Sequence, residues 1–151
     1  MDTTLASPVA RILGLDVGEK RIGLALSDPM GFTAGPLGVL ERKDVETTAN
    51  AVKRLVEKHQ AQAIVVGLPL TLRGSKGPQA QRVHSFVLEL RKRLLVPIIM
   101  EDERLTTVQG ERALREAGAS RKQRKAAIDQ VAAQLILQAY LDRNRNSALL
   151  E

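Results

Sequence analysis

The chain contains no cysteine and no tryptophan, and its aromatic residues are limited to two phenylalanines and one tyrosine. Without cysteine it forms neither a disulfide framework nor a thiolate metal site, and it has no thiol nucleophile. The scarcity of aromatics argues against a surface on which nucleic-acid bases stack, as they do in many single-strand-binding proteins. The core must therefore be built from leucine, isoleucine, valine and alanine.

Long apolar segments are also missing. No run approaches the roughly 20 apolar residues that a helix needs to cross a membrane. Residues 1–10 lack a basic region followed by an apolar stretch, so they do not have the pattern of a secretory signal. We therefore expect a cytoplasmic protein.

Positive charge exceeds negative charge. The 151 residues include 23 Lys and Arg against 17 Asp and Glu, which gives a formal net charge of +6. A basic excess of this size favours polyanionic partners such as nucleic acids. The length is that of one domain. We expect this domain over residues 10–143, with a disordered lead-in at 1–9 and a flexible tail at 144–151.

The hydrophobic pattern predicts an α/β fold. Helical spacing of apolar residues predicts helices over 45–59, 78–94, 107–117 and 121–143. Shorter apolar runs predict strands over 10–16, 21–27, within 32–40, over 63–69 and over 96–100. A helix between two such strands is the crossover unit of a parallel sheet. We therefore predict a mixed five-stranded sheet, three antiparallel strands followed by two parallel ones, flanked by helices.

Asp16 stands at the end of the first predicted strand, just before a glycine turn. Burying an ionised carboxylate there costs several kcal/mol unless a cation or hydrogen-bond donors meet it. Magnesium or manganese would meet that need, because hard cations prefer oxygen ligands. The alternative is that Asp16 caps the turn by binding its own backbone.

Three more acids are expected near the same edge. Asp102 and Glu103 follow the fifth strand, and Asp129 borders the apolar face of the last helix. Sites in open α/β sheets lie at the carboxyl ends of the strands. A cluster of three or four acids there would hold two divalent ions about 3.5–4 Å apart, an arrangement used for displacement at phosphorus. Taken singly, Asp129 fits a solvated helix position, and Asp102 and Glu103 fit charges at the start of a helix.

Basic residues flank the expected site on both sides. They would bind phosphates on either side of a scissile bond, although charge runs at helix starts are also typical of solvated surfaces. The residues from which we expect nucleic-acid contacts are Lys20, Arg21, Arg73, Lys76, Arg104, Arg121, Lys122, Arg124 and Lys125.

Four segments together resemble the YqgF/RuvX family, a bacterial branch of the RNase H-like nucleases. They are residues 15–23 (LDVGEKRIG), 66–69 (VGLP), 102–107 (DERLTT), and Asp129 with the apolar pairs 132–133 and 136–137. The resemblance extends over about residues 10–142. It implies an RNase H-like fold and a metal-dependent nuclease that processes pre-16S rRNA or resolves Holliday junctions.

The resemblance also assigns roles. It implies that Asp16, Glu103 and Asp129 are the catalytic acids and metal ligands, with Asp102 as a further ligand or a support. Related resolvases have an acid after the fourth strand, where this chain has residues 67–69 (GLP). The Asp102–Glu103 pair would then supply that charge from the fifth strand.

The leading hypothesis is a nuclease that uses Mg²⁺ or Mn²⁺, with two ions expected, and that acts on structured RNA during ribosome maturation. The close alternative is a Holliday-junction-resolving DNA endonuclease, which needs two active sites and hence a homodimer; the sequence leaves monomer or homodimer open. A non-catalytic nucleic-acid binder would have no need for three acids together. An ATP-binding domain of the actin and sugar-kinase type would need a second aspartate–glycine hairpin, and the sequence has none.

Overall fold

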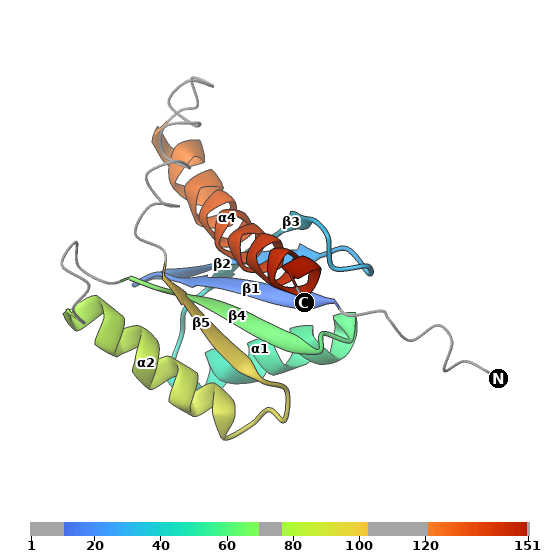
Figure 1. The fold of residues 1–151 in the computed structure, drawn as a ribbon. Helices are drawn as coiled ribbons and strands as arrows, with labels where there is room; N and C mark the ends of the chain where they lie inside the picture. The colour runs from blue at the N-terminus through green and yellow to red at the C-terminus, as the bar shows by residue number, and fades with distance from the viewer. Residues whose placement is uncertain (1–10, 70–76, 103–120, 151) are drawn as a thin grey trace.

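The computed structural model describes residues 11–69, 77–102 and 121–150, and within the last segment it describes the side chains of residues 129–144. Figure 1 shows the order of the elements along the chain. They are β1 (Ile12–Val17), β2 (Arg21–Ser27), β3 (Ala34–Glu41), α1 (Val45–His59), β4 (Ala63–Leu68), α2 (Pro78–Arg91), β5 (Ile98–Asp102) and α4 (Arg121–Leu150).

The five strands form one sheet in the order β3-β2-β1-β4-β5. The β1–β2 and β2–β3 pairs are antiparallel, whereas the β1–β4 and β4–β5 pairs are parallel. The helices α1 and α2 make the crossovers that parallel pairing requires. The predicted mixed sheet is therefore confirmed.

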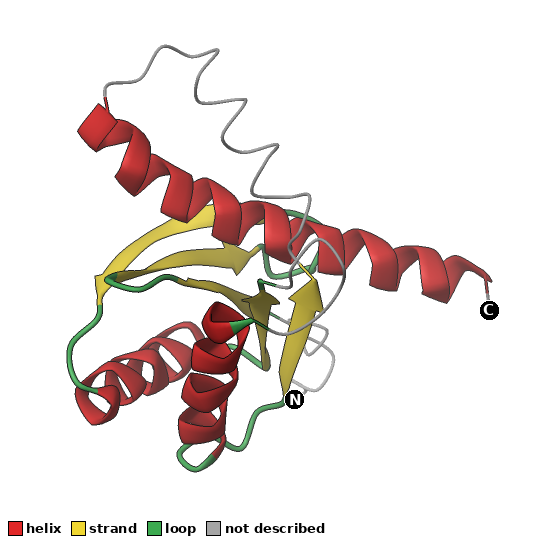
Figure 2. Cartoon of the chain, turned by 90° about the vertical axis from the view of Figure 1, so that its left-hand side faces the viewer, coloured by secondary structure: helices red, strands yellow, loops and turns green. Residues whose placement is uncertain are grey.

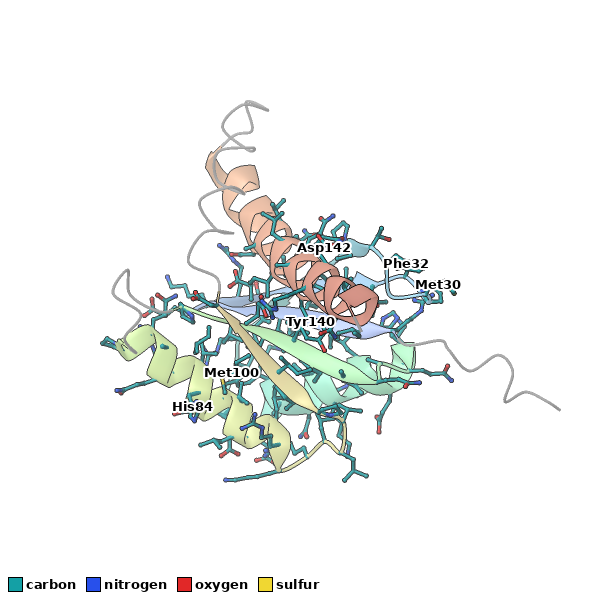
Figure 3. All side chains as sticks on the ribbon, viewed as in Figure 1. Met30, Phe32, His84, Met100, Tyr140 and Asp142 are labelled. Carbon is teal, nitrogen blue, oxygen red and sulfur yellow. The ribbon has the colours of Figure 1, made fainter. Side chains whose placement is uncertain are left out.

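Helices cover both faces of the sheet: α1 and α2 lie on one face, and α4 crosses the other (Figures 1 and 2). The larger core, between the sheet and α1 and α2, includes Leu13, Leu15 and Phe86. The smaller core, beneath α4, includes Val65 and Leu137. In Figure 3, Met100 lies towards α2 and Tyr140 lies between α4 and the sheet. Because strand side chains alternate between faces, these two cores tell which face each strand residue occupies.

Local signals place α1 where the sequence predicts it. The Asp44 side chain accepts a hydrogen bond from the Thr47 backbone N–H at 2.8 Å, which is the N-cap arrangement. The helix ends before Gln60, which adopts a left-handed conformation with φ of 54°. Lys58 and His59 occupy the last turn, where positive charge favours the helix dipole.

Several predicted boundaries are wrong. The last helix continues to Leu150 rather than ending at 143, because residues 144–150 contain no glycine or proline to stop it. The helix α2 ends at Arg91, before the predicted 94. The strand β5 runs over 98–102 instead of 96–100, so it begins after Pro97, which has no N–H for the ladder.

Two other predictions, the lead-in at 1–9 and the helix at 107–117, lie outside the described residues. Among the helices that the structure describes, none combines the length and the apolar character that crossing a membrane would require.

Candidate active site

Asp16 lies on the face of the sheet that α4 covers. Its neighbours Leu15 and Val17 point into the core beneath α1 and α2, so the alternation of the strand turns Asp16 to the other face. Asp16 pairs with Gly23 of β2 on one side. On the other side, Leu15 pairs with Val66, which places Asp16 level with Gly67 of β4. A partly buried carboxylate is thus flanked by two residues that have no side chain.

Gly23, Asp16 and Gly67 lie side by side on neighbouring strands and form a row across the sheet. The last helix approaches this row at Gly23. A Cβ atom built on Gly23 would lie 1.9 Å from the backbone oxygen of Asp129. The backbone of Asp129 therefore rests directly on the residue that pairs with Asp16. The fold brings two of the predicted acids, from the first strand and the last helix, to the same end of the sheet, where β1 ends. This end is called the edge below.

Arg21 holds the carboxylate of Asp129. Its Nε donates a hydrogen bond to Asp129 Oδ2 at 2.8 Å, and the two side chains are 38% and 21% exposed. Arg21 opens β2 two residues before Gly23, so both face α4. The sequence assigned Arg21 to phosphate contact and Asp129 to metal binding. The structure adds that these two residues contact each other.

The turn between β1 and β2 is closed by backbone contacts. The Gly18 N–H donates to the Arg21 carbonyl at 2.8 Å, and a Cβ on Gly18 would lie 2.7 Å from that oxygen. From the far end of β3, Arg42 Nη1 donates to the Gly18 carbonyl at 2.9 Å. Sequence reasoning missed Arg42, because no local pattern tells that it reaches this turn.

A hollow of about 340 Å³ lies beside the turn, and its lining joins the turn to the last helix. Both basic residues that the sequence predicted here take part, and so does Asp129. The lining residues are Gly18, Glu19, Lys20, Arg21 and Asp129. Acidic and basic groups thus meet at one concave surface, as a nucleic-acid backbone with a bound cation would require.

Asp102 occupies the opposite face from Asp16. It is the last residue of β5 and pairs with Leu68. Ile98 and Met100, which alternate with it, pack towards α1 and α2, so Asp102 also points to that side. Its side chain is exposed. Its role as a metal ligand or support stays a prediction.

Glu101 is a buried acid on the α4 face that sequence reasoning missed. It pairs with Gly67 and so lies in the same row as Asp16. Its side chain is 4% exposed, and both of its oxygens accept hydrogen bonds from Arg143 of α4. These hydrogen bonds raise the pKa of Arg143. Alternation along β5 could have indicated that Glu101 faces inward, but not which cation meets it.

Several predicted residues cannot be placed. Glu103, Arg104, Arg73 and Lys76 lie outside the described residues, and the side chains of residues 121–125 are not described although they open α4. Within the described part of the chain, no three His, Cys, Asp or Glu side chains come close enough to hold a metal ion. Asp16 and Asp129, which the fold brings to the same end of the sheet, carry carboxylate oxygens, the donors that Mg²⁺ and Mn²⁺ prefer.

Known proteins resemble this chain over most of its length. The family model RuvX, described as Holliday junction resolvase, matches residues 10–143. A protein of Moorella thermoacetica named "Putative pre-16S rRNA nuclease" is 50% identical over 133 residues, covering 88% of this chain and 95% of that protein. A protein of the same name from Roseiflexus sp. is 46% identical over 141 residues, covering 93% and 100%.

Two solved structures share the fold at low sequence identity. Thermus thermophilus RuvC in complex with a Holliday junction substrate has a TM-score of 0.58 and 18% identity, over 89% of this chain and 96% of that one. The fowlpox virus Holliday junction resolvase has a TM-score of 0.55 and 10% identity, over 89% and 99%. Because the family model and the relatives span most of the sequence, this chain belongs to the RuvX family that its motifs resemble.

Proposed function

We propose that this protein is a divalent-metal-dependent nuclease that processes pre-16S rRNA. The observation that carries the proposal is the convergence of Asp16 and Asp129 at one sheet edge, where Asp129 rests on the strand partner of Asp16. Lys20 and Arg21 border the same hollow. The names of the relatives at 46–50% identity support both the activity and the substrate.

The chemistry is hydrolysis of a phosphodiester. A water molecule attacks phosphorus, the bond from phosphorus to one bridging oxygen breaks, and the leaving oxygen takes up a proton. Asp16, Glu103 and Asp129 would hold Mg²⁺ or Mn²⁺, which stabilises the negative charge that develops on the phosphoryl oxygens. Arg21 positions the Asp129 carboxylate through its 2.8 Å hydrogen bond. Lys20 lies in the same hollow and binds a neighbouring phosphate.

A second candidate substrate is the Holliday junction, which the description of the family model favours. Cutting a junction symmetrically requires two active sites, and therefore a homodimer. A protein that cuts junctions but not RNA, and that sediments as a dimer, would move the assignment to this candidate.

The first test is a cleavage assay of the wild type, Asp16→Asn and the control Glu57→Gln, which changes an exposed acid of α1. The substrates are a labelled pre-16S rRNA fragment, single-stranded RNA and a four-way DNA junction, each with Mg²⁺, Mn²⁺ or EDTA. We expect RNA cleavage that EDTA and Asp16→Asn abolish and Glu57→Gln leaves intact. Cleavage that persists in Asp16→Asn or in EDTA would overturn the proposal.

Metal binding is measured separately from activity. A ligand at 100 times its Kd stabilises the folded state by about 2.7 kcal/mol. Saturating Mn²⁺ should therefore raise the thermal midpoint of the wild type and of Glu57→Gln, but raise that of Asp16→Asn much less. An equal rise in all three proteins would remove Asp16 from the metal site.

A further inference from the structure

Three hollows on the surface adjoin one another, because each neighbouring pair shares two lining residues. The hollow beside Asp129 shares Gly18 and Glu19 with a second one of about 140 Å³. The second shares Arg42 and Arg82 with a third of about 830 Å³, which lies between α1 and α2. We call this row of hollows the path: it runs from Asp129, past the β1–β2 turn, to the groove between the two helices on the other face of the sheet.

Arginines occupy the middle of this path. The Arg42 guanidinium lies 5.5 Å above the centre of the Phe86 ring, while its Nη1 binds the Gly18 carbonyl at 2.9 Å. A guanidinium fixed on an aromatic face keeps its other N–H groups in a set direction. The Arg82 side chain is 55% exposed, and its Nη1 lies 3.8 Å from Glu19 Oε1. These two arginines line both the second and the third hollow.

The lining of the α1–α2 groove includes two acids, Glu46 and Glu89. Glu89 is neutralised by Lys92 at 2.9 Å and by Arg93 at 3.1 Å, and these cations lower its pKa. Glu46 lies in the first turn of α1. In the second hollow, Arg42 and Arg82 meet a single acid, Glu19, so positive charge prevails in its lining. Because the Phe86 side chain is buried and Arg42 lies over its ring, it offers no free face for a base, so the lining suits phosphates rather than bases.

We propose that a nucleic-acid strand with its scissile phosphate at the Asp16–Asp129 edge continues along this path, and that Arg42 and Arg82 bind a phosphate of the strand at the entrance to the α1–α2 groove. The proposal rests on the proposed function and adds a second phosphate subsite to it. A strand is favoured over a free anion because neighbouring hollows share lining residues all the way from Asp129 to the groove. Recognition there is independent of base sequence, since only backbone charge is read.

Glu19 allows a second test of the proposal, in which the expected change in strand binding has the opposite direction. Its side chain is 77% exposed and it is the acid beside Arg82, so it repels an incoming phosphate and competes for the arginine. Removing its charge should strengthen strand binding, whereas removing the charge of Arg82 should weaken it. A variant that merely loosened the fold would not produce both effects.

The test measures binding of fluorescent single-stranded RNA of about 16 nucleotides by anisotropy, in EDTA so that nothing is cut. We expect Arg82→Gln to weaken binding about tenfold and to reduce the slope of log K against log salt by about 0.7. Glu19→Gln should tighten binding. The matched control Arg54→Gln removes an exposed charge of α1 that lines none of the three hollows, and should change little.

Each outcome has a distinct meaning. If Arg82→Gln and Glu19→Gln both behave like Arg54→Gln, the subsite is wrong even where cleavage is normal. If Arg82 is needed to bind a nucleoside monophosphate but not the strand, the proposal is also overturned. If the binding changes are as expected but no substrate is cut, the proposed function fails while the strand path stands. Thermal melting of Arg82→Gln, expected at the wild-type midpoint, shows that its fold is retained.

Discussion

At Gly23 the helix α4 and the sheet meet backbone to backbone. A Cβ at this position would lie 1.9 Å from the backbone oxygen of Asp129 and 2.4 Å from its backbone carbonyl carbon. Neither atom belongs to a flexible side chain that could turn away, so any larger residue must push α4 off β2. Glycine is required here for close approach rather than for its backbone freedom, because φ is not positive.

The substitution Gly23→Ala should therefore lower the free energy of unfolding by about 3 kcal/mol, at the upper end for overpacking. Denaturant unfolding measures the change. The control is Gly35→Ala, where the nearest atom to a new Cβ is the Leu26 oxygen at 4.0 Å, and it should cost less than about 0.5 kcal/mol. Equal stability of the two variants would show that α4 does not press on Gly23.

Asp16 and Asp129 could be selected from the sequence as candidate acids, but the residue that binds Asp129 could not. Asp16 stands out because a carboxylate ends an apolar strand. Nothing near Asp129 in the sequence tells that Arg21 binds it, because the two are 108 residues apart. Glu101 and Arg143 were missed for the same reason, since their contact depends on where α4 crosses β5.

At the scale of the element, the β2–β3 turn is organised by one carboxylate. Asp28 accepts backbone hydrogen bonds from Met30 at 3.0 Å and from Phe32 and Thr33 at 2.7 Å. The Thr33 hydrogen bond is the main cause that lowers the Asp28 pKa below 3.8, with Phe32 and Met30 adding to it and desolvation opposing it. The charged carboxylate is thus favoured by the folded state.

This lowered pKa fixes the direction of a pH effect. The stabilisation by Asp28 is complete above its unfolded pKa, near 3.8, and is lost as the pH falls through the lower folded value. The variant Asp28→Ala should be less stable than the wild type at pH 7, and the difference should shrink towards pH 2. Urea unfolding across this range measures it. A difference that stays constant with pH would mean that the carboxylate charge does not hold the turn.

Element boundaries were predictable where a local signal marks them. The helix α1 matches its predicted residues because Asp44 caps its start. The end of α4 has no such signal, and the residues after 143 simply continue the helix. The position of β5 depends on its partner β4, whose pairing extends the strand to Asp102. The apolar run alone could not indicate where β5 ends.

At the scale of the molecule, α4 forms a layer by itself. Its buried residues Ala133, Ile136, Leu137 and Leu141 make the smaller core with Ala25, Ala34 and Val65. Leu137 packs where β1 has Gly14, whose added Cβ would lie 2.9 Å from the Leu137 Cβ. The packing of this one helix therefore determines whether Asp129 reaches the edge that carries Asp16.

Truncating Leu137 should weaken both stability and the candidate site. Its side chain is fully buried, so Leu137→Ala should cost about 2–5 kcal/mol and reduce cleavage in proportion to the loss of docked α4. Calorimetry and the cleavage assay measure the two effects. Leu88→Ala removes a half-exposed leucine of α2 and serves as control. Full activity of Leu137→Ala, with the helix undocked, would separate α4 from the site.

The contact between Arg21 and Asp129 also has a consequence for protein synthesis, because the two residues are far apart in the sequence. During synthesis the sheet residues 12–102 are made before any part of α4 exists, so the nascent sheet carries Asp16 without Asp129. At about 5–20 residues per second, the 108 residues that separate Arg21 from Asp129 take roughly 5–20 s to add. For that interval the growing chain lacks one of the two acids of the proposed site. On the proposed roles of Asp16 and Asp129, the nuclease stays inactive until its last helix has been made.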